Sequence, residues 1–559
     1  MGQPYIIVPP QGQDPADEWM KLGVEAQAGG NLPKAQQHYG QALRLDPRHA
    51  LATQNLAIVF AQSNLLNEAL VTIERASMMD GVHGVIKMNW ALMALEADQI
   101  DTALTVAKQG VEIAPNAETR MALAMALTTA GMPEQAIPIY EEILKENPKH
   151  PSAGPNSCFI QTLTTATPKD LAAQRKLWHD ANAYTGVRGG HNNDKTLTRP
   201  LRVGYVGGDF KTHSAAMIFG ATIKKHSPAI VPYFYSTLPL NPETDGQSKA
   251  FQAVAGDRWR DISTLDDEKA ETLVRQDQID LLVDLAGHTN GGRLSLFLRK
   301  PAPIQVTAWG FAHGTGCPEI DYFLADPIAV PESERPFYVE HIMDLPCIVS
   351  YAVPDYPVKT SSLLPYYKNG YLTFGTYARY EKMSEVCLTT FAEILRRVPE
   401  SRLEFKDHGC RRPYSIRRIH SLMPDIAKER LLFSIATSHQ EHMQAYQQAD
   451  LILDPFPHGG GVVSLEQLYM GVPMVTKYGT QPSGRTAASV LTAMGKTDWI
   501  AKDDAEYVEK AVAMVQDIPA LAKIRKTLHD EFMTSSVIVG YVDAVEAAYR
   551  TMWERWCKK

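Results

Sequence analysis

A glycine-rich turn between two apolar segments is the part of the chain best suited to chemistry. The apolar residues Leu451–Leu453 end at Asp454, and a predicted helix carrying Glu466 about one turn in begins a few residues later. Between them lie three consecutive glycines: Gly459, Gly460 and Gly461. Glycines let the backbone turn tightly and approach a ligand, and the helix would direct free N–H groups at a phosphate. Because Glu466 could then reach ribose hydroxyls, the unit suits a sugar nucleotide.

Length, charge and cysteine usage narrow the class of protein. A chain of 559 residues predicts about two to four domains. Its net charge of -8 argues against a nucleic-acid binder held by phosphate contacts. The six cysteines are scattered with no C-x-x-C pair, which favours reduced thiols in a cytoplasmic protein and gives no zinc motif. The first ten residues lack the features of a secretory signal, and no apolar run is long enough for a bilayer, so no membrane partner is expected.

The N-terminal part, residues 14–150, repeats with a period of about 34 residues, which predicts about four tetratricopeptide repeats. Asn55 and Asn89 occupy equivalent positions on the first helices of repeats two and three. There an amide could bind the backbone of an extended acceptor peptide, although asparagine is also common at this position for structural reasons. A plain helical bundle is the alternative fold. The first copy of the pattern contains Trp19, Leu22, Gly23, Ala35, Tyr39, Ala42 and Pro47.

The remainder alternates apolar strand candidates with helical stretches, which predicts parallel sheets covered by helices on both faces. A transition segment at 151–198 precedes two such blocks, at 199–365 and 366–559, read as Rossmann-like lobes with a ligand cleft between them. The last helical stretch, residues 541–556, is predicted to cross back to the first lobe. The strand candidates are 202–206, 231–236, 280–285, 304–308, 322–325, 371–377, 402–406, 431–435, 451–453 and 473–476.

Several motifs resemble the protein O-GlcNAc transferases, in which tetratricopeptide repeats are fused to a GT-B glycosyltransferase. The resemblance covers nearly the whole chain. It implies an α-helical superhelix followed by an α/β GT-B fold of two Rossmann-like lobes with parallel sheets. The family also includes SPINDLY-type O-fucosyltransferases and bacterial members. The motifs are Arg299-Lys-Pro-Ala-Pro-Ile-Gln305, Trp309-Gly310, Gly314-Thr315-Gly316, Asp450-Leu-Ile-Leu-Asp454, Gly471-Val-Pro-Met-Val-Thr476 and Ser483-Gly-Arg485-Thr-Ala-Ala-Ser489.

Inverting transfer from a nucleotide sugar needs a base near the acceptor hydroxyl and positive potential on the leaving diphosphate. No Asp-x-Asp pair for a divalent metal is found, so cations and backbone amides would neutralise the diphosphate. Lys382 matches the family lysine with that role, and the amides of Val462 and Val463 would face the same group. His213 aligns with a family active-site histidine and is a candidate base, with capping or packing as its alternative. His288 is a second, more weakly supported candidate near the acceptor.

The nucleotide site departs from the animal enzymes, although His442 retains a histidine that contacts the nucleobase in the family. The histidines at 439 and 442 could instead bind a metal, but no third ligand is apparent. The departures bear on the identity of the donor's base and sugar. They are His439 for a lysine, Ala445 for an arginine, Arg379 for a glutamine near the diphosphate lysine, Val462 and Val463 for two threonines, Gly461 for a histidine, and Glu466 for the ribose-binding aspartate.

The resemblance therefore predicts a cytoplasmic, metal-independent, inverting glycosyltransferase that moves GlcNAc from UDP-GlcNAc to Ser and Thr hydroxyls of proteins. It would need no cofactor beyond the donor, and its repeats would present the acceptor. One alternative uses another donor, such as GDP-fucose. A second is a tetratricopeptide scaffold whose transferase domain binds nucleotide but scarcely turns over. Acceptor proteins and oligomeric state are left open.

Overall fold

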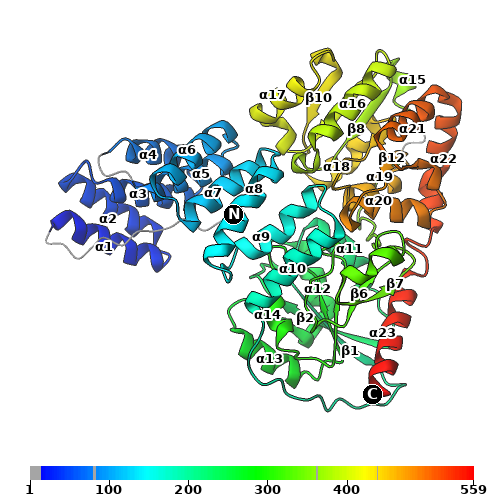
Figure 1. The fold of residues 1–559 in the computed structure, drawn as a ribbon, viewed down its shortest axis with the longest axis horizontal. Helices are drawn as coiled ribbons and strands as arrows, with labels where there is room; N and C mark the ends of the chain where they lie inside the picture. The colour runs from blue at the N-terminus through cyan, green and yellow to red at the C-terminus, as the bar shows by residue number, and fades with distance from the viewer. Residues whose placement is uncertain (1–13, 80–82, 361–362, 437) are drawn as a thin grey trace. The chain divides into compact units, whose positions relative to one another are not determined.

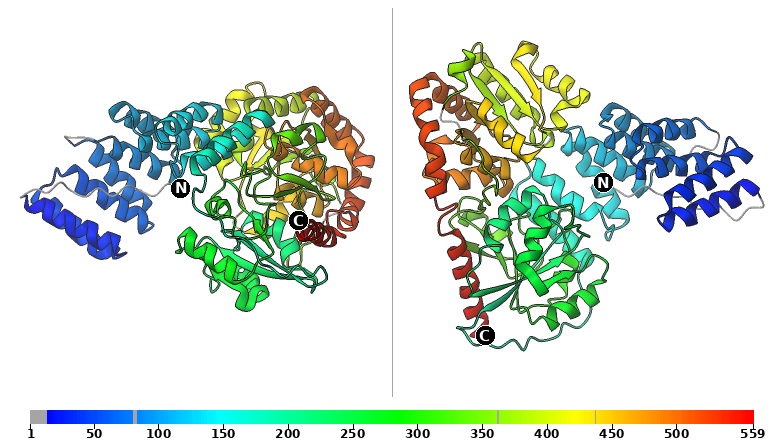
Figure 2. Two further views of the ribbon diagram at one scale, coloured as in Figure 1. Left: turned by 60° about the horizontal axis from the view of Figure 1, so that its bottom comes forward. Right: turned by 180° about the vertical axis from the view of Figure 1, so that it is seen from behind.

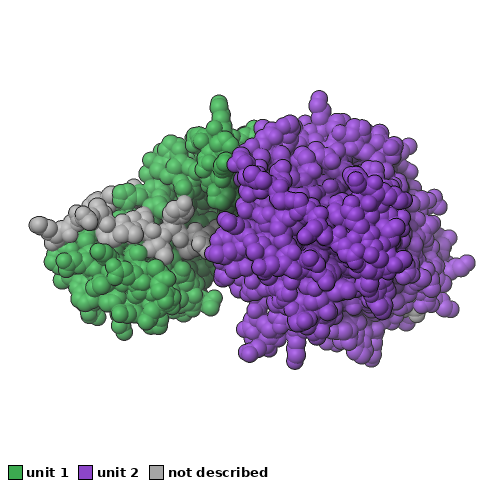
Figure 3. Space-filling model, turned by 90° about the horizontal axis from the view of Figure 1, so that it is seen from below, with its two compact units in different colours: residues 1–153, 412–418 green, residues 154–411, 419–559 purple. Residues whose placement is uncertain are grey.

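The computed structural model describes residues 14–79, 83–360, 363–436 and 438–559. The N-terminal segment considered above for targeting lies outside them. The chain forms two compact units, one of residues 1–153 with 412–418 and one of residues 154–411 with 419–559 (Figure 3). Among the described residues, no helix combines the length and the apolar character needed to cross a membrane.

The first unit is an array of helix pairs, as the repeat pattern predicts (Figure 1). Tyr39 explains one motif position, because a Cβ atom on Gly23 would lie 2.5 Å from its Cε1 atom. The small residue thus lets the two helices of the first pair approach closely. The pairs are α1 (Pro15–Ala28) with α2 (Leu32–Leu45), α3 (Ala50–Gln62) with α4 (Leu66–Ser77), α5 (Gly84–Glu96) with α6 (Ile100–Ile113), and α7 (Ala117–Thr129) with α8 (Pro133–Glu146).

The two asparagines predicted to bind an acceptor peptide lie inside this packing. Asn55 and Asn89 each have 0% of their surface exposed, and Gln54 Nε2 donates to Asn55 Oδ1 at 3.4 Å. A side chain without exposed surface cannot contact a peptide in this conformation. The structure therefore corrects the peptide-binding prediction in favour of its structural alternative, in which the amides satisfy polar groups within the array.

The second unit begins with a helical segment and continues as two parallel sheets (Figure 1). The first sheet has the strand order β3-β2-β1-β4-β5-β6-β7, and every pair in it is parallel. Its elements are α9 (Ala153–Ile160), η1 (Gln161–Leu163), α10 (Pro168–Asn182), β1 (Leu201–Gly207), α11 (Ser214–Ile223), β2 (Ile230–Ser236), α12 (Gly246–Ala255), β3 (Trp259–Asp261), α13 (Asp267–Gln276), β4 (Leu281–Asp284), α14 (Leu294–Leu298), β5 (Ile304–Thr307), β6 (Tyr322–Ala325), η3 (Glu332–Phe337) and β7 (His341–Asp344).

The second sheet has the order β10-β9-β8-β11-β12-β13, again parallel throughout. Its elements are α15 (Tyr366–Asn369), β8 (Thr373–Thr376), η4 (Tyr380–Lys382), α16 (Glu385–Arg397), β9 (Arg402–Lys406), α17 (Pro413–Leu422), β10 (Leu431–Ser434), α18 (His439–Ala445), β11 (Leu451–Leu453), α19 (Val462–Tyr469), β12 (Met474–Lys477), α20 (Pro482–Ala493), β13 (Ile500–Ala501), α21 (Asp504–Gln516), α22 (Ile518–Thr534) and α23 (Tyr541–Cys557).

This architecture confirms the predicted fold class of helical repeats followed by two α/β lobes with parallel sheets. Each of the ten strand candidates corresponds to an observed strand, with ends shifted by no more than a few residues. The sequence prediction omitted β3, β7 and β13, which are all edge strands. Edge strands of this kind are partly exposed and therefore lack the continuous apolar run that marks a buried strand.

The lobes of the second unit are held together by the C-terminal helix and by a partly buried ion pair. Figures 1 and 2 show α23 running along the first lobe, where Trp309 Nε1 donates to Tyr541 Oη at 3.0 Å. The predicted crossing of this helix is thus confirmed. Arg485 of α20 binds Glu334 of η3 through two hydrogen bonds of 2.5 and 2.7 Å. A bidentate pair of this type fixes geometry as well as distance.

Candidate functional site

The glycine loop is shaped by Asp454, which follows β11. One carboxylate oxygen of Asp454 accepts from the amide of Gly460 at 2.8 Å, and the other accepts from Thr476 Oγ1 at 2.7 Å. The side chain is 2% exposed, and burial raises its pKa to about 6. A Cβ atom on Gly460 would lie 2.3 Å from Ser464 Oγ. The loop is therefore tied to the sheet by a carboxylate and tolerates no side chain at its centre.

Lys382 places a cation on this loop. It lies in η4, just after β8, and its Nζ donates to the carbonyl oxygen of Gly459 at 2.9 Å. Burial and, after it, the charge of the exposed Arg379 together lower the pKa of Lys382 to about 7. An anion bound here would favour the protonated amine and so reverse that shift. The structure thus brings together the predicted lysine and the predicted glycine loop.

Helix α19 begins on the same loop. Gly461 is its N-cap and provides no side-chain acceptor for the first amides of the helix. These N–H groups and the helix dipole favour an anion at the loop. The side chains of Val462 and Val463 add no hydrogen-bond donor, so any contribution of these two residues to anion binding comes from the backbone.

Glu466 lies beneath the loop and is bound by both predicted nucleotide-site histidines. His439 Nε2 lies 2.8 Å from Glu466 Oε1, and His442 Nε2 lies 2.9 Å from Glu466 Oε2. Tyr446 Oη donates to the same Oε2 at 3.2 Å. Burial alone would raise the pKa of Glu466, but the hydrogen bonds from the two histidines outweigh it and lower the pKa to about 2. The carboxylate is therefore ionised.

The hydrogen bond made by Nδ1, the ring nitrogen that faces away from Glu466, decides the tautomer of each imidazole. His439 Nδ1 is hydrogen-bonded to the hydroxyl of Tyr356, and His442 Nδ1 to the ammonium of Lys406. If Nδ1 accepts in both rings, each Nε2 carries a hydrogen and donates it to Glu466. Glu466 has only 2% of its surface exposed, and both of its carboxylate oxygens are hydrogen-bonded to protein groups in this structure. Its predicted contact with ribose stays a prediction and requires a rearrangement of the histidines.

His213 stands at the start of α11 as its N-cap and is 45% exposed. The amide of Ala215 donates to its Nδ1 at 3.2 Å, while Asp209 Oδ2 lies 3.4 Å from the same nitrogen. One nitrogen cannot accept from an amide and donate to a carboxylate at once. Only the amide contact has hydrogen-bond geometry, so in this structure Nδ1 accepts from Ala215 and the hydrogen of the neutral ring lies on Nε2. A base at Nε2 would need the other tautomer, in which Nδ1 donates to Asp209, a neighbour that the sequence analysis did not name.

His288 is less suited to acceptor binding than predicted. It is 3% exposed, and its Nε2 lies 2.8 Å from the carbonyl oxygen of Thr315, to which it must donate. Burial lowers its pKa to about 4. The ring also packs edge-on against Trp178 at 4.9 Å between ring centroids. These contacts describe a buried packing histidine rather than one that can contact an acceptor.

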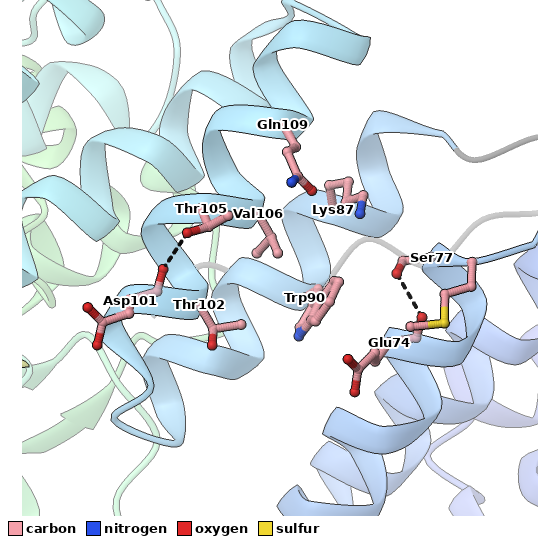
Figure 4. A pocket seen from close by; sticks show the side chains of 10 residues that line it. Glu74, Ser77, Lys87, Trp90, Asp101, Thr102, Thr105, Val106 and Gln109 are labelled. Atoms are coloured by element: carbon pink, nitrogen blue, oxygen red, sulfur yellow. Dashed lines mark hydrogen bonds between the residues drawn. The ribbon is translucent and has the colours of Figure 1, made fainter. Parts of the chain in front are cut away.

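A separate hollow lies in the helical array, between α4, α5 and α6 (Figure 4). Its volume is about 510 Å³, and Trp90 lies in it with Lys87 Nζ 5.1 Å from the centre of its ring. The hollow contains none of the residues predicted for nucleotide binding. Its lining is Glu74, Ser77, Met78, Lys87, Trp90, Asp101, Thr102, Thr105, Val106 and Gln109.

Comparison with known proteins agrees with this architecture. The model of glycosyl transferase family 41 matches residues 132–356 and 352–542, and a tetratricopeptide repeat model matches residues 20–77. A solved structure of a lysine-to-methionine mutant of the Thermobaculum terrenum O-GlcNAc transferase superimposes with a TM-score of 0.81. It is 25% identical and the match covers 98% of this chain and 99% of that one.

Two curated relatives from Arabidopsis thaliana are named as probable UDP-N-acetylglucosamine–peptide N-acetylglucosaminyltransferases. SPINDLY is 35% identical over 381 residues, covering 66% of this chain and 41% of the relative. SEC is 30% identical over 373 residues, covering 64% and 37%. The chain therefore spans about two fifths of the length of these relatives. Because the family model matches well over half of its residues, the chain belongs to glycosyl transferase family 41.

Proposed function

We propose that this protein is an inverting, metal-independent glycosyltransferase that moves GlcNAc from UDP-GlcNAc to Ser or Thr hydroxyls of proteins. The observation that carries the proposal is the ammonium of Lys382 on the carbonyl of Gly459, at the N-terminus of α19. A lysine, a glycine loop and free helix amides form a site for the diphosphate of a sugar nucleotide. The names of the curated relatives favour UDP-GlcNAc as the donor.

In the proposed reaction the acceptor hydroxyl attacks the anomeric carbon from the face opposite the diphosphate. The bond from that carbon to the diphosphate oxygen breaks, and the electron pair leaves with the nucleotide. Lys382 and the first amides of α19 stabilise the charge that develops on the leaving oxygen. His213 takes the hydroxyl proton at Nε2 in the tautomer whose Nδ1 donates to Asp209 instead of accepting from Ala215. The protein residues thus serve as base, orienting group and anion site.

A different donor with the same reaction is the second candidate. Gly461, Val462 and Val463 supply no side-chain hydrogen bonds where the family offers them, and His439 and Glu466 alter the nucleoside side of the site. These positions bear on the donor rather than on the leaving-group chemistry. A GDP-sugar such as GDP-fucose is therefore the donor against which UDP-GlcNAc must be tested. The proposal further places the protein in the cytoplasm, with acceptor proteins presented by the repeats.

Calorimetric titration with UDP, GDP, UDP-GlcNAc and GDP-fucose tests the donor. We expect UDP and UDP-GlcNAc to bind at least about tenfold more tightly than their guanosine counterparts, a difference of about 1.4 kcal/mol. The reverse order would replace the donor but keep the reaction. If none of the four bound, the transferase proposal would fail and an interaction scaffold would remain. Transfer of labelled sugar to a library of Ser- and Thr-containing peptides then separates an enzyme from a nucleotide-binding scaffold.

Donor binding should take up a proton above neutral pH. The pKa of Lys382 is about 7 in the free protein, and a bound diphosphate raises it because it stabilises the ammonium. At pH 8 about nine tenths of the free lysines are neutral, so binding takes up as much as about 0.9 proton, whereas at pH 6 it takes up about 0.1. Affinity should correspondingly weaken as pH rises from 6 to 8, by up to about tenfold.

Titrations of UDP-GlcNAc in buffers of different ionisation enthalpy measure this uptake. UDP-GlcNAc is the better ligand for the purpose because its diphosphate, esterified at both ends, does not titrate between pH 6 and 8. Lys382→Met is the control and should reduce the uptake at pH 8 to near zero. Equal uptake in that variant and in the original protein would show that another group carries the proton.

A further inference from the structure

We propose that His458 is a donor-sugar-binding residue, whose Nε2 accepts a hydrogen bond from a hydroxyl group of the sugar to be transferred. The inference rests on the proposed function and assigns a role to a residue that the site described so far does not use. His458 directly precedes Gly459, the residue whose carbonyl accepts the Lys382 ammonium. It therefore stands beside the position of the diphosphate, where the donor sugar is attached.

A hydrogen bond to the segment before the first lobe fixes the orientation of the His458 ring. His458 Nδ1 lies 3.1 Å from the carbonyl oxygen of Thr162, a residue of η1 in the segment before the first lobe. A carbonyl can only accept, so Nδ1 carries the hydrogen. The hydroxyl of Thr162 is 3.3 Å from the same nitrogen but donates its own hydrogen to the carbonyl oxygen of Phe159 at 2.7 Å. The tautomer with a lone pair on Nε2 follows.

That lone pair is available to a ligand. No described residue forms a hydrogen bond with Nε2 of His458, and the nitrogen is not enclosed, because the side chain is only partly buried. The ring also stays neutral. Its burial, followed by the charges of Lys382, Arg379 and His313, holds the pKa of His458 well below the usual range of histidine. A neutral imidazole with one free lone pair is an acceptor for a hydroxyl and offers nothing to a phosphate.

The stereochemistry of transfer indicates which molecule carries the hydroxyl that His458 Nε2 accepts from. In an inverting reaction the acceptor hydroxyl and its base lie on the face of the sugar opposite the leaving diphosphate. His458 is next to the residue that binds Lys382 and hence lies on the leaving-group side. The hydroxyls on that side belong to the donor, and because the ribose is assigned to the side of Glu466, those of the sugar are left for His458. A base for the acceptor is required elsewhere, and His213 supplies it in the proposed mechanism.

The substitution His458→Asn tests the roles of the two ring nitrogens separately. The asparagine amide can still donate to the Thr162 carbonyl, but it places no acceptor at the position of Nε2. We expect UDP to bind within about twofold of its original affinity and UDP-GlcNAc to bind about 3–10-fold more weakly, the loss of one hydrogen bond. His458→Gln, which can place an oxygen near that position, should recover part of the loss. Thermal melting of each variant checks that the loop is folded.

UDP-GlcNAc analogues lacking the 3-, 4- or 6-hydroxyl identify the group. One analogue should bind the original protein and His458→Asn equally, because its missing hydroxyl is the partner of Nε2. Equal UDP-GlcNAc affinity in the two proteins, or an equal loss of UDP and UDP-GlcNAc affinity, would overturn the proposal, the latter by showing a purely structural role. If the original protein bound neither UDP nor UDP-GlcNAc, the proposed donor itself would fall, a result distinct from a failure at His458.

Discussion

Replacing Lys382 with methionine should lower the turnover of sugar transfer by about 10²–10³-fold, the loss typical of removing one group that stabilises a developing oxyanion. The methionine has nearly the length of the lysine stem but no charge. It therefore removes the cation at the Gly459 carbonyl while largely filling its space. The effect should appear in the rate with saturating donor, because the ammonium interacts most strongly with the charge that develops as the diphosphate leaves.

The same substitution should not weaken the free protein. Because burial lowers the pKa of Lys382 in the folded state to about 7, the unfolded chain holds this proton more tightly between about pH 7 and 10.5. The stability cost of this lysine therefore grows as pH falls from about 10.5 to 7 and is full below pH 7, so the variant should melt at an equal or higher temperature. Lys368→Met, at an exposed position of α15, is the matched control and should leave turnover unchanged. A turnover for Lys382→Met within about threefold of the original would remove this lysine from the mechanism.

The sequence was sufficient to predict the layout of the molecule because its elements depend on local patterns. The spacing of Gly23 and Tyr39 reports a close approach of two helices, and apolar runs such as Leu451–Leu453 report buried strands. Short, partly exposed edge strands such as Trp259–Asp261 give too weak a signal of this kind to be predicted. Local pattern also gives no measure of burial for a single polar side chain, and Asn55 was accordingly misread.

The sequence is sufficient to predict which residues belong to the candidate site, but not how those residues contact one another. His439, His442 and Glu466 were each expected at the nucleotide site, yet no pattern in the chain indicates that both imidazoles bind the one carboxylate. The contact of His458 with Thr162 joins residues 296 positions apart. Such pairs are set by how the segment before the first lobe packs on the second lobe. Only a three-dimensional structure contains that information.

Substituting Glu466 with glutamine should weaken donor binding strongly, even though the side chain keeps its size. In the present structure both oxygens of Glu466 accept, one from His439 and the other from His442 with Tyr446. Glutamine replaces one oxygen by an NH₂ group, which would face an Nε2–H donor. To avoid two opposed donors, one histidine must change tautomer and lose its partner on the far side, Tyr356 or Lys406.

An unsatisfied buried polar group costs about 1–3 kcal/mol, which corresponds to a loss of about 5–150-fold in donor affinity if the histidines must be in place for binding. Glu466→Asp, the residue of the animal enzymes, keeps both acceptors on a shorter stem and is the conservative control. It should lose less affinity than Glu466→Gln. Titration of UDP into the three proteins measures the order. If Glu466→Gln bound UDP as tightly as the original protein, the histidine–carboxylate cluster would be a purely structural feature of α18 and α19, and the nucleoside would be bound elsewhere on the lobe.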